Sequence, residues 1–510
     1  SICPSGPRTG TPLSGTPTMF PPRSMRPTLF LALFLCFALP ASAAAAAAAL
    51  GQAVVREAVD SDGQVSLLQM DRGMRLPAAA PLKQQSPPEL TDWDMYEETA
   101  PFPTKAEAPA VNHDVPEFIV DLDAPPELRW RNVTRYYKSI GAYPECCTAV
   151  PKAVLHHTMP GRLELVRMFT LPLQLFLLRG MPPLSDEHRR ELEGIVADVG
   201  DPLVTVDGLH LANMGYEFLG DSGTLEDPAA FVEMIVELAK DPKYIPSDLF
   251  RPKKIGCSGI LAAMKDGTVV HGRNMDLSMF EVDTGEKLLH WGDVTVDVLF
   301  TRQGAPFISS VGWPGQIGVH TAMRFGGWSF EQNTRDHFYM TDAVYAHKQQ
   351  SEGFELGVRR IMETTSDFDK AVDLVYNGNW MSPQYFIMAG AKPFQGAIVT
   401  VDQGSQHRND TPPLMLLSNA SGMFRDGVWY GSWHLMQSND DHFKAPQDYR
   451  RPEEEYRLYK FEPYRDSISP EWMMTEITGM SLFNKATVFS TVYVPKTGYH
   501  KTFAHPENLR

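Results

Sequence analysis

The second half of this chain consists largely of short runs in which apolar and polar residues alternate, and this pattern constrains the fold most. Alternation with a period of two is typical of β-strands that bury one face, and turn-forming residues bound each run. The runs predict seven strands, at residues 257–264, 268–274, 294–301, 306–311, 386–389, 397–401 and 487–494. Helices are predicted among them at 351–364 and 367–376. We therefore expect helices packed on an antiparallel double sheet, an α+β fold.

The first half has a different texture, and residues 127–218 follow a helical pattern. An apolar stripe over residues 163–177 recurs at spacings of three and four, and Pro172 should kink that helix. Two interpretations stay open for the stripe. It is either a helix of the core or an amphipathic helix that meets a membrane surface or a lipid substrate, since arginines flank it.

The N-terminus carries the pattern of a secretory signal peptide. A basic Met25-Arg26-Pro27 precedes an apolar run at 28–39, and Ala41-Ser42-Ala43 offers a cleavage site. The alternative is an uncleaved anchor extended by the alanine tract at 43–49. We expect residues 1–43 to be upstream sequence and signal peptide, and the mature protein to be soluble in the secretory pathway, in lysosomes or outside the cell.

Residues 44–115 are rich in alanine, proline and acidic side chains without sustained periodicity, which predicts a disordered linker or pro-segment. Three glycosylation sequons, at Asn132, Asn409 and Asn419, agree with export. A net charge of -16 argues against a nucleic-acid partner. The sequence has no metal-ligand cluster and no phosphate-binding glycine loop, so no metal and no cofactor is expected.

An unpaired cysteine is the first sign of chemistry. Cys3 and Cys36 lie in or before the signal, and Cys146 and Cys147 are adjacent, so that they pair only as a strained vicinal disulfide or with partners elsewhere. Cys257 is left as the candidate free thiol, and a lone thiol in an exported protein favours a catalytic role.

The segment around Cys257 supplies further reactive groups. Its strand and the strand ending in His271-Gly272-Arg273-Asn274-Met275-Asp276 would form a hairpin that brings the thiol, Arg273 and Asp276 together. We expect Arg273 to favour the thiolate and Asp276 to orient an amine or a proton. The alternative is a structural ion pair between these two residues.

These residues resemble the family of acid ceramidase and N-acylethanolamine acid amidase. The resemblance lies in the cysteine with its following strand and in the His-Gly-Arg-Asn-Met-Asp motif, and it spans roughly residues 117–505. Further blocks occur in the family's order, at residues 121–130, 191–213, 390–402, 437–442 and 448–451. The bile-salt and penicillin amidases are a weaker match, because they lack the long helical segment before the cysteine.

The resemblance implies an αββα N-terminal-nucleophile hydrolase sandwich preceded by a helical subunit. The chain would be a zymogen that cuts itself between Gly256 and Cys257 and needs no cofactor. Residues 116–256 would form the helical alpha subunit, with an insertion at 218–256, and residues 257–510 the catalytic beta subunit. The two fragments would stay associated.

The resemblance also implies roles for individual residues. Arg273 and Asp276 would position the substrate, Asn439 would donate to the oxyanion, and Arg450 would brace the cleavage site. Read alone, Asn439 is more readily a turn residue and Arg450 a solvated charge, and it is their occurrence together in the family's order that favours the functional roles.

Three departures from the family pattern accompany the match. They are the insertion before Cys257, Ser258-Gly259 in place of Thr-Ser, and an Asn333-Thr334-Arg335 block that lacks the usual carboxylate at its second position. Glu331 is the nearby carboxylate that would compensate for Thr334, so we assign Glu331, Asn333 and Thr334 to substrate binding.

The implied activity is hydrolysis of an N-acyl lipid, through a Cys257 thioester, at a membrane or micelle surface. The motifs do not separate ceramide from N-acylethanolamine as the substrate. The alternative from another functional class is a non-catalytic lipid-binding protein on the same fold.

Overall fold

We analysed a computed structural model of the chain. It describes residues 113–143, 182–214, 256–277, 282–283, 288–335, 350–402, 404, 414–420, 423–425, 428–430, 432–443, 448, 450–479 and 482–506. All of them belong to the second of the two units into which the chain divides, Ser86–Arg510. The apolar stripe, Asn409, the Cys146-Cys147 pair and the insertion up to residue 255 lie outside the described residues.

The described part of the chain has mixed helix and sheet content, with two large sheets. The first has the strand order β1(His113–Asp114), β18(Tyr499–Ala504), β17(Thr487–Val494), β4(Val269–Asp276), β3(Ser258–Ala263), β16(His434–Gln437). The second has the order β13(Met415–Leu416), β12(Gly396–Val401), β11(Gln384–Gly390), β10(Trp328–Thr334), β9(Thr321–Arg324), β8(Ala305–Gly312), β7(Val296–Arg302), β2(Glu117–Asp121). Short hairpins pair β5(Val282–Asp283) with β6(Leu288–Leu289) and β14(Met423–Arg425) with β15(Val428–Tyr430).

The two sheets pack face to face. Strands β3 and β4 of the first sheet contact β10 and β11 of the second, and one apolar cluster joins Ile260 and Leu261 to Tyr385 and Ile387. Helix α16(Pro470–Ile477) covers β4 and β17 on the outer face of the first sheet, and α15(Arg450–Phe461) packs on β16. Apolar side chains removed from water on both faces stabilise this stack.

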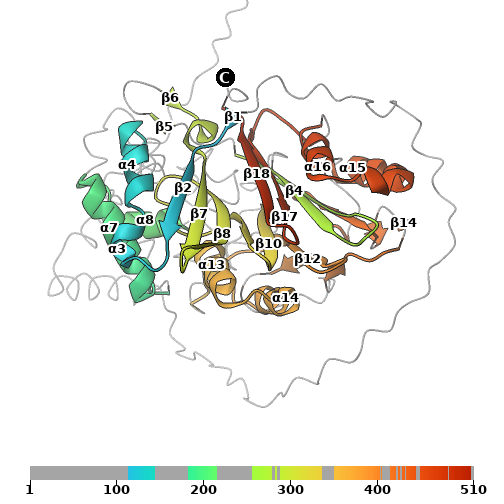
Figure 1. Ribbon diagram of the computed structural model, residues 1–510, viewed down its shortest axis with the longest axis horizontal. Coiled ribbons are helices and arrows are strands. Elements are labelled where there is room, and N and C mark those ends of the chain that lie inside the picture. Colours follow the sequence, from blue (N-terminus) through green and yellow to red (C-terminus); the bar gives the residue numbers. More distant parts are fainter. Residues whose placement is uncertain are drawn as a thin grey trace, which may run out of the picture. The chain divides into compact units, whose positions relative to one another are not determined.

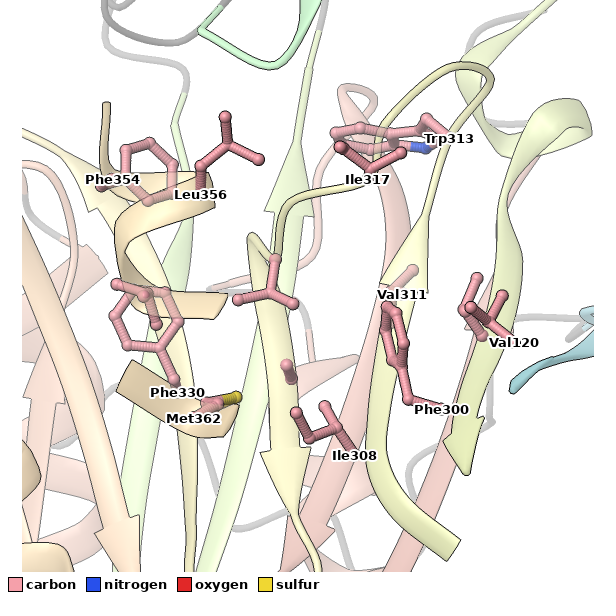
Figure 2. Packing of buried hydrophobic residues seen from close by; sticks show 14 of the residues in the cluster. Val120, Phe300, Ile308, Val311, Trp313, Ile317, Phe330, Phe354, Leu356 and Met362 are labelled. Atoms are coloured by element: carbon pink, nitrogen blue, oxygen red, sulfur yellow. The ribbon is translucent and has the colours of Figure 1, made fainter. Parts of the chain in front are cut away.

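The outer face of the second sheet packs on further helices. Helix α14(Phe368–Tyr376) lies on β11 and β12, and Phe354 of α13(Phe354–Thr364) contacts Phe330 and Phe386. Figure 2 shows this layer, with side chains of α13 lying against β10 and β8. The order of layers is helix, sheet, sheet, helix, in agreement with the sequence prediction.

The residues before Cys257 include the helices α3(Pro126–Arg129), α4(Arg131–Ser139), α7(Asp186–Val199) and α8(Val206–Ala212). The Ser185 side chain caps the start of α7, and Gly200 ends it with a φ of 69° that favours glycine. The same region also supplies strand β2, which pairs in parallel with β7 (Figure 1). The expectation of purely antiparallel sheets and a purely helical first segment was wrong in this respect, because an extended Glu117–Asp121 completes the edge of the second sheet.

A buried charge cluster ties α7 to its neighbours. Both carboxylate oxygens of Glu191 accept hydrogen bonds: from Arg129 at 2.7 Å, from Trp130 Nε1 at 2.7 Å and from Arg359 at 2.6 and 2.7 Å. Burial alone would raise the pKa of Glu191, but these partners, Arg359 above all, lower it to about 2. The cluster joins helices α3, α7 and α13.

The seven strands predicted from alternation are all present, as are both predicted helices, with ends that differ by a few residues. The disordered linker was predicted to reach residue 115, but ordered structure begins earlier, because His113–Asp114 forms β1 and pairs with β18. No helix in the described ranges has the length and apolar character needed to cross a bilayer.

Candidate active site

The β3–β4 hairpin brings the predicted nucleophile and its neighbours together. Gly259 of β3 stands opposite Arg273 of β4, so Cys257, just before β3, lies beside the end of β4. Its Sγ atom is 3.5 Å from Arg273 Nη2 and 3.4 Å from Met275 Sδ. Side chains of a strand alternate between its faces, which places Arg273 and Met275 together on the face that meets the thiol.

The charge state of the thiol differs from the sequence expectation. Burial raises the pKa of Cys257, and the favourable field of Arg273 does not offset the loss of water. Burial outweighs the charge of Arg273 in the uncut chain, although that charge does favour the thiolate, as expected, because it lowers the pKa of the thiol. A neutral thiol next to a fixed cation is the resting arrangement.

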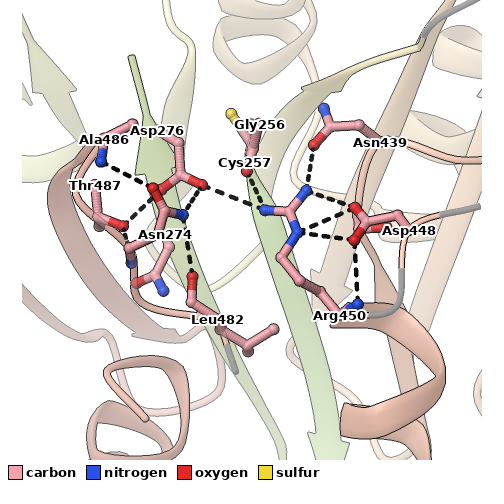
Figure 3. A network of polar contacts seen from close by, with 12 residues as sticks. Gly256, Cys257, Asn274, Asp276, Asn439, Asp448, Arg450, Leu482, Ala486 and Thr487 are labelled. Carbon is pink, nitrogen blue, oxygen red and sulfur yellow. Dashed lines mark hydrogen bonds and ion pairs between the residues drawn. The ribbon is translucent and has the colours of Figure 1, made fainter. Parts of the chain in front are cut away.

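Arg450 connects the cleavage site with three other side chains (Figure 3). Its Nη1 atom donates to the carbonyl oxygen of Gly256 and lies 3.3 Å from Asp276 Oδ2, while Nη2 donates to Asn439 Oδ1 at 3.1 Å. Asp448 fixes the guanidinium from the far side, with distances of 2.6 Å to Nη2 and 3.0 Å to Nε. A guanidinium held in this fork geometry directs its remaining N–H groups with little freedom.

Asn439 lies directly against Gly256. A side chain at position 256 would have no room, because an added Cβ would be 2.1 Å from Asn439 Oδ1. Asn439 Nδ2 also donates to the carbonyl oxygen of Thr334 at 2.8 Å. The amide group is thus fixed beside the peptide bond that joins Gly256 to Cys257.

Asp276 is the second carboxylate near Arg450, and it is buried. Its Oδ1 atom accepts from Thr487 and its Oδ2 atom from Asn484, each at 2.7 Å. Burial raises the pKa of Asp276 to about 6, although Arg450 pulls it the other way. This side chain therefore exchanges its proton in mildly acidic solution, where a group that orients an amine or a proton is useful.

Strand β10 approaches the same site from the second sheet. Asn333 accepts from Arg273 Nη1 at 3.2 Å and donates to the carbonyl oxygen of Gln437 at 2.9 Å. The Thr334 hydroxyl lies 3.4 Å from Gln332 Nε2, on the opposite face of the strand from Asn333. The structure therefore brings Asn333 to the thiol site, whereas the side chain of Thr334 faces away from it.

Glu331 shares the inward face of β10 and is fully buried. Its Oε2 atom is 3.3 Å from His271 Nε2 and 3.8 Å from Arg273 Nη1. Nearby, His320 Nδ1 is 3.1 Å from Arg273 Nη2. Burial, together with Arg273, holds the pKa of His320 well below its usual value, so a neutral ring accepts this hydrogen bond.

Several site residues had no assigned role in the sequence analysis. Asp448 lies in a block noted for its resemblance, two positions before the arginine it holds. Asn484, Thr487 and His320 have no sequence signal of their own, because only the folded sheets bring them to Asp276 and Arg273. In the described parts of the chain, no three His, Cys, Asp or Glu side chains are grouped as metal ligands.

Two of the three predicted glycosylation sites are described, and both asparagines are exposed. Asn132 lies near the start of α4, and the Asn419 side chain accepts from Arg465 at 3.3 Å. Both are open to solvent.

The chain is similar to several known proteins. A family model for the beta subunit of N-acylethanolamine-hydrolyzing acid amidase matches residues 113–143. An N-acylethanolamine-hydrolyzing acid amidase of Caenorhabditis elegans is 24% identical over 380 residues, which is 74% of this chain and 88% of that protein. The acid ceramidase of Homo sapiens is 24% identical over 262 residues, which is 48% of this chain and 61% of the ceramidase.

The chain is similar to acid ceramidase and N-acylethanolamine acid amidase. These matches agree with the resemblance stated from the sequence, and the Caenorhabditis elegans relative is named for hydrolysing N-acylethanolamine. The solved structure of the Caenorhabditis elegans ortholog of N-acylethanolamine-hydrolyzing acid amidase aligns with a TM-score of 0.40 at 24% identity, covering 49% of this chain and 100% of that one.

Proposed function

We propose that this protein is a self-cleaving lipid amidase, which hydrolyses the amide bond of an N-acyl lipid through Cys257. One observation carries the proposal. The carbonyl oxygen of Gly256 accepts a hydrogen bond from Arg450, and Cys257 is the next residue in the chain. A cation on a peptide carbonyl next to a thiol is the arrangement that an attack on that carbonyl needs.

Self-cleavage begins when the Cys257 thiol loses its proton and attacks the Gly256 carbonyl carbon. Arg450 stabilises the oxyanion that forms, because it donates to this carbonyl, and Asn439 lies beside Gly256 and accepts from Arg450. The bond from carbon to the Cys257 nitrogen then breaks, the nitrogen takes a proton, and a thioester remains. Water hydrolyses the thioester, which leaves a carboxylate on Gly256 and a free α-amino group on Cys257.

The new amino group changes the chemistry of the thiol. An unperturbed α-amino group has a pKa of about 7.7 to 8.0, so it serves as the base for its own side chain. The thiolate attacks the lipid amide, the amino group passes the proton to the leaving amine, and the acyl chain stays on sulfur. Water then releases the fatty acid and restores the thiol.

Three neighbouring residues take the roles that the family resemblance implies. Arg273 and Asp276 hold the amine end of the substrate, and Asn439 donates to the oxyanion during turnover. The lipid reaches the protein from a membrane or micelle surface, in a lysosome or outside the cell, and the two fragments remain associated after the cut. Ceramide and N-acylethanolamine are both candidate substrates, as these are the lipids named by the relatives.

The test is intact mass and N-terminal sequencing of the secreted protein at acid pH, with Cys257→Ala as control. We expect a new chain that begins at Cys257 and is absent from the control. The processed protein is then incubated with each lipid, and the released fatty acid is measured. A chain that stays whole and binds N-acyl lipid without releasing fatty acid would contradict the proposal and favour the lipid-binding alternative.

A further inference from the structure

Arg273 carries a buried positive charge whose compensation comes from the opposite sheet. Its guanidinium contacts neutral groups: the carbonyl oxygen of Gln332 at 2.7 Å, Asn333 Oδ1 at 3.2 Å and the neutral ring of His320. A buried cation is strongly unfavourable without an opposite charge. In the described part of the chain, the carboxylate within 4.0 Å of this guanidinium is that of Glu331, at 3.8 Å.

Glu331 is fully buried between the sheets, and neither carboxylate oxygen has a hydrogen-bond donor among the described residues. His271 holds it on the other side, because Nδ1 of that ring is 2.8 Å from Ser329 Oγ and Nε2 faces Glu331 at 3.3 Å. The carboxylate is thus placed between an imidazole and a guanidinium. A buried carboxylate is strongly unfavourable unless neighbouring charges or hydrogen bonds compensate it.

Gly259 provides the space that this carboxylate occupies. An added Cβ at position 259 would lie 1.7 Å from Glu331 Oε1, far inside van der Waals contact. Gly259 is also the residue opposite Arg273 in the β3–β4 register. The long acidic side chain from the facing sheet therefore occupies the space that a side chain at position 259 would need.

We propose that Glu331 is a positioning residue of the thiol site, that it neutralises and orients Arg273 next to Cys257, and that Gly259 is required to admit it. The inference deepens the proposed function and rests on it for its catalytic part. Glu331 touches Arg273 and His271 and is closed to solvent, so it acts on the thiol through Arg273 rather than by contact with lipid.

The pairing is tested first without any activity, by a double-mutant cycle in uncut Cys257→Ala protein. Glu331→Gln, Arg273→Met and the double variant are unfolded in denaturant. We expect Glu331→Gln to lower the midpoint clearly when Arg273 is present and little when it is replaced, since contacting residues couple and distant ones add. Strictly additive losses would overturn the pairing, whether or not the protein is an enzyme.

The catalytic part is tested in active protein by kinetics on the lipid substrate. We expect Glu331→Gln to lower kcat by about tenfold or more and to raise KM by less, because the residue orients Arg273 without itself touching lipid. Gly259→Ala should have a similar effect. In a Glu331→Ala background the same glycine substitution should cost nothing further, since the atoms it crowds are gone.

The control is Glu363→Gln, which removes a half-buried partner of Arg359 in helix α13 and should leave kcat unchanged. Multiplying effects of the Gly259 and Glu331 substitutions, or a rise in KM with kcat unchanged in Glu331→Gln, would overturn the positioning role. An inactive wild-type chain with the stability coupling intact would count against the proposed function and against the catalytic part, while supporting the pairing of Glu331 with Arg273.

Discussion

The guanidinium of Arg450 donates to the carbonyl oxygen of Gly256, although the two residues are 194 positions apart in the chain. Asp448 holds the same guanidinium through both of its carboxylate oxygens. The carbonyl that precedes Cys257 is therefore polarised by a group whose direction is fixed before any reaction starts.

Replacing Arg450 tests that arrangement. Lysine keeps the charge but has no planar fork, so Arg450→Lys cannot hold Asp448 and the Gly256 carbonyl together. We expect cleavage before Cys257 to slow by about a hundredfold, as loss of an oxyanion donor does elsewhere. The rate is followed by gel densitometry of the two fragments. Arg457→Lys, on the same helix, is the control, and equal rates for both variants would contradict the assignment.

Gly256 should tolerate no side chain. In Gly256→Ala the methyl group would collide with Asn439 Oδ1, and either the peptide or the amide must move. We predict a folded chain that is cut at least about tenfold more slowly. The circular dichroism spectrum and mass spectrometry together check this. If Gly256→Ala slowed cleavage and Gly256→Ala with Asn439→Gly did not recover any of the loss, the collision would not be its cause.

The raised pKa of Asp276 makes stability depend on pH. Its pKa is about 6 in the fold against an ordinary value of 3.8, so between these limits the folded chain binds more protons than the unfolded chain. The contribution of this residue to stability is then fully present below pH 3.8 and declines as pH rises to 6. In uncut Cys257→Ala protein, we compare how Asp276→Asn changes the free energy of unfolding at two pH values. The change should favour the folded state by about 2 to 3 kcal/mol more at pH 7.5 than at pH 4. Urea unfolding at the two pH values measures the difference, and equal effects would refute it.

Glu191 should behave in the opposite way. Its folded pKa of about 2 lies below the ordinary 4.5, so its contribution is present above pH 4.5 and is lost as pH falls toward 2. At pH 7, Glu191→Gln leaves buried arginines without their partner and should cost about 3 to 5 kcal/mol. Glu193→Gln, exposed on the same helix, is the control. A loss of similar size in both variants would show that the helix, and not the charge cluster, is responsible.

The sequence predicted the strands that carry apolar alternation but not β2, β9, β16, β18 or β10, and of these β10 bears most on the site. The β10 residues Ser329, Glu331 and Asn333 form a polar row on a buried face, because that face contacts His271 and Arg273. A pattern based on apolar residues fails where buried positions are used for chemistry. Strand β10, which the apolar pattern did not predict, therefore lies in the candidate site.

Local patterns predicted the parts of the site that lie close together in the sequence, but not the parts that lie far apart. Cys257, Arg273 and Asp276 belong to one hairpin, and period-two geometry is enough to bring them together. The contact of Arg450 with Gly256 came only from the family resemblance. Two residues donate hydrogen bonds to Asp276: Asn484 and Thr487. They belong to a distant strand and the turn before it, and no local pattern connects them with the hairpin.

Strand β2 has a consequence for the life of the cut protein. It lies at the edge of the second sheet beside β7, and Tyr137, from the helix that follows, donates to the carbonyl oxygen of Val294 at 2.9 Å. After a cut at Gly256, these contacts would join two separate polypeptides. Refolding would then require an encounter between them and would slow on dilution, whereas the uncut precursor folds at a rate independent of concentration. The precursor would be the only form able to reach this structure efficiently, so maturation would fix the enzyme in a state that it cannot easily regain once lost.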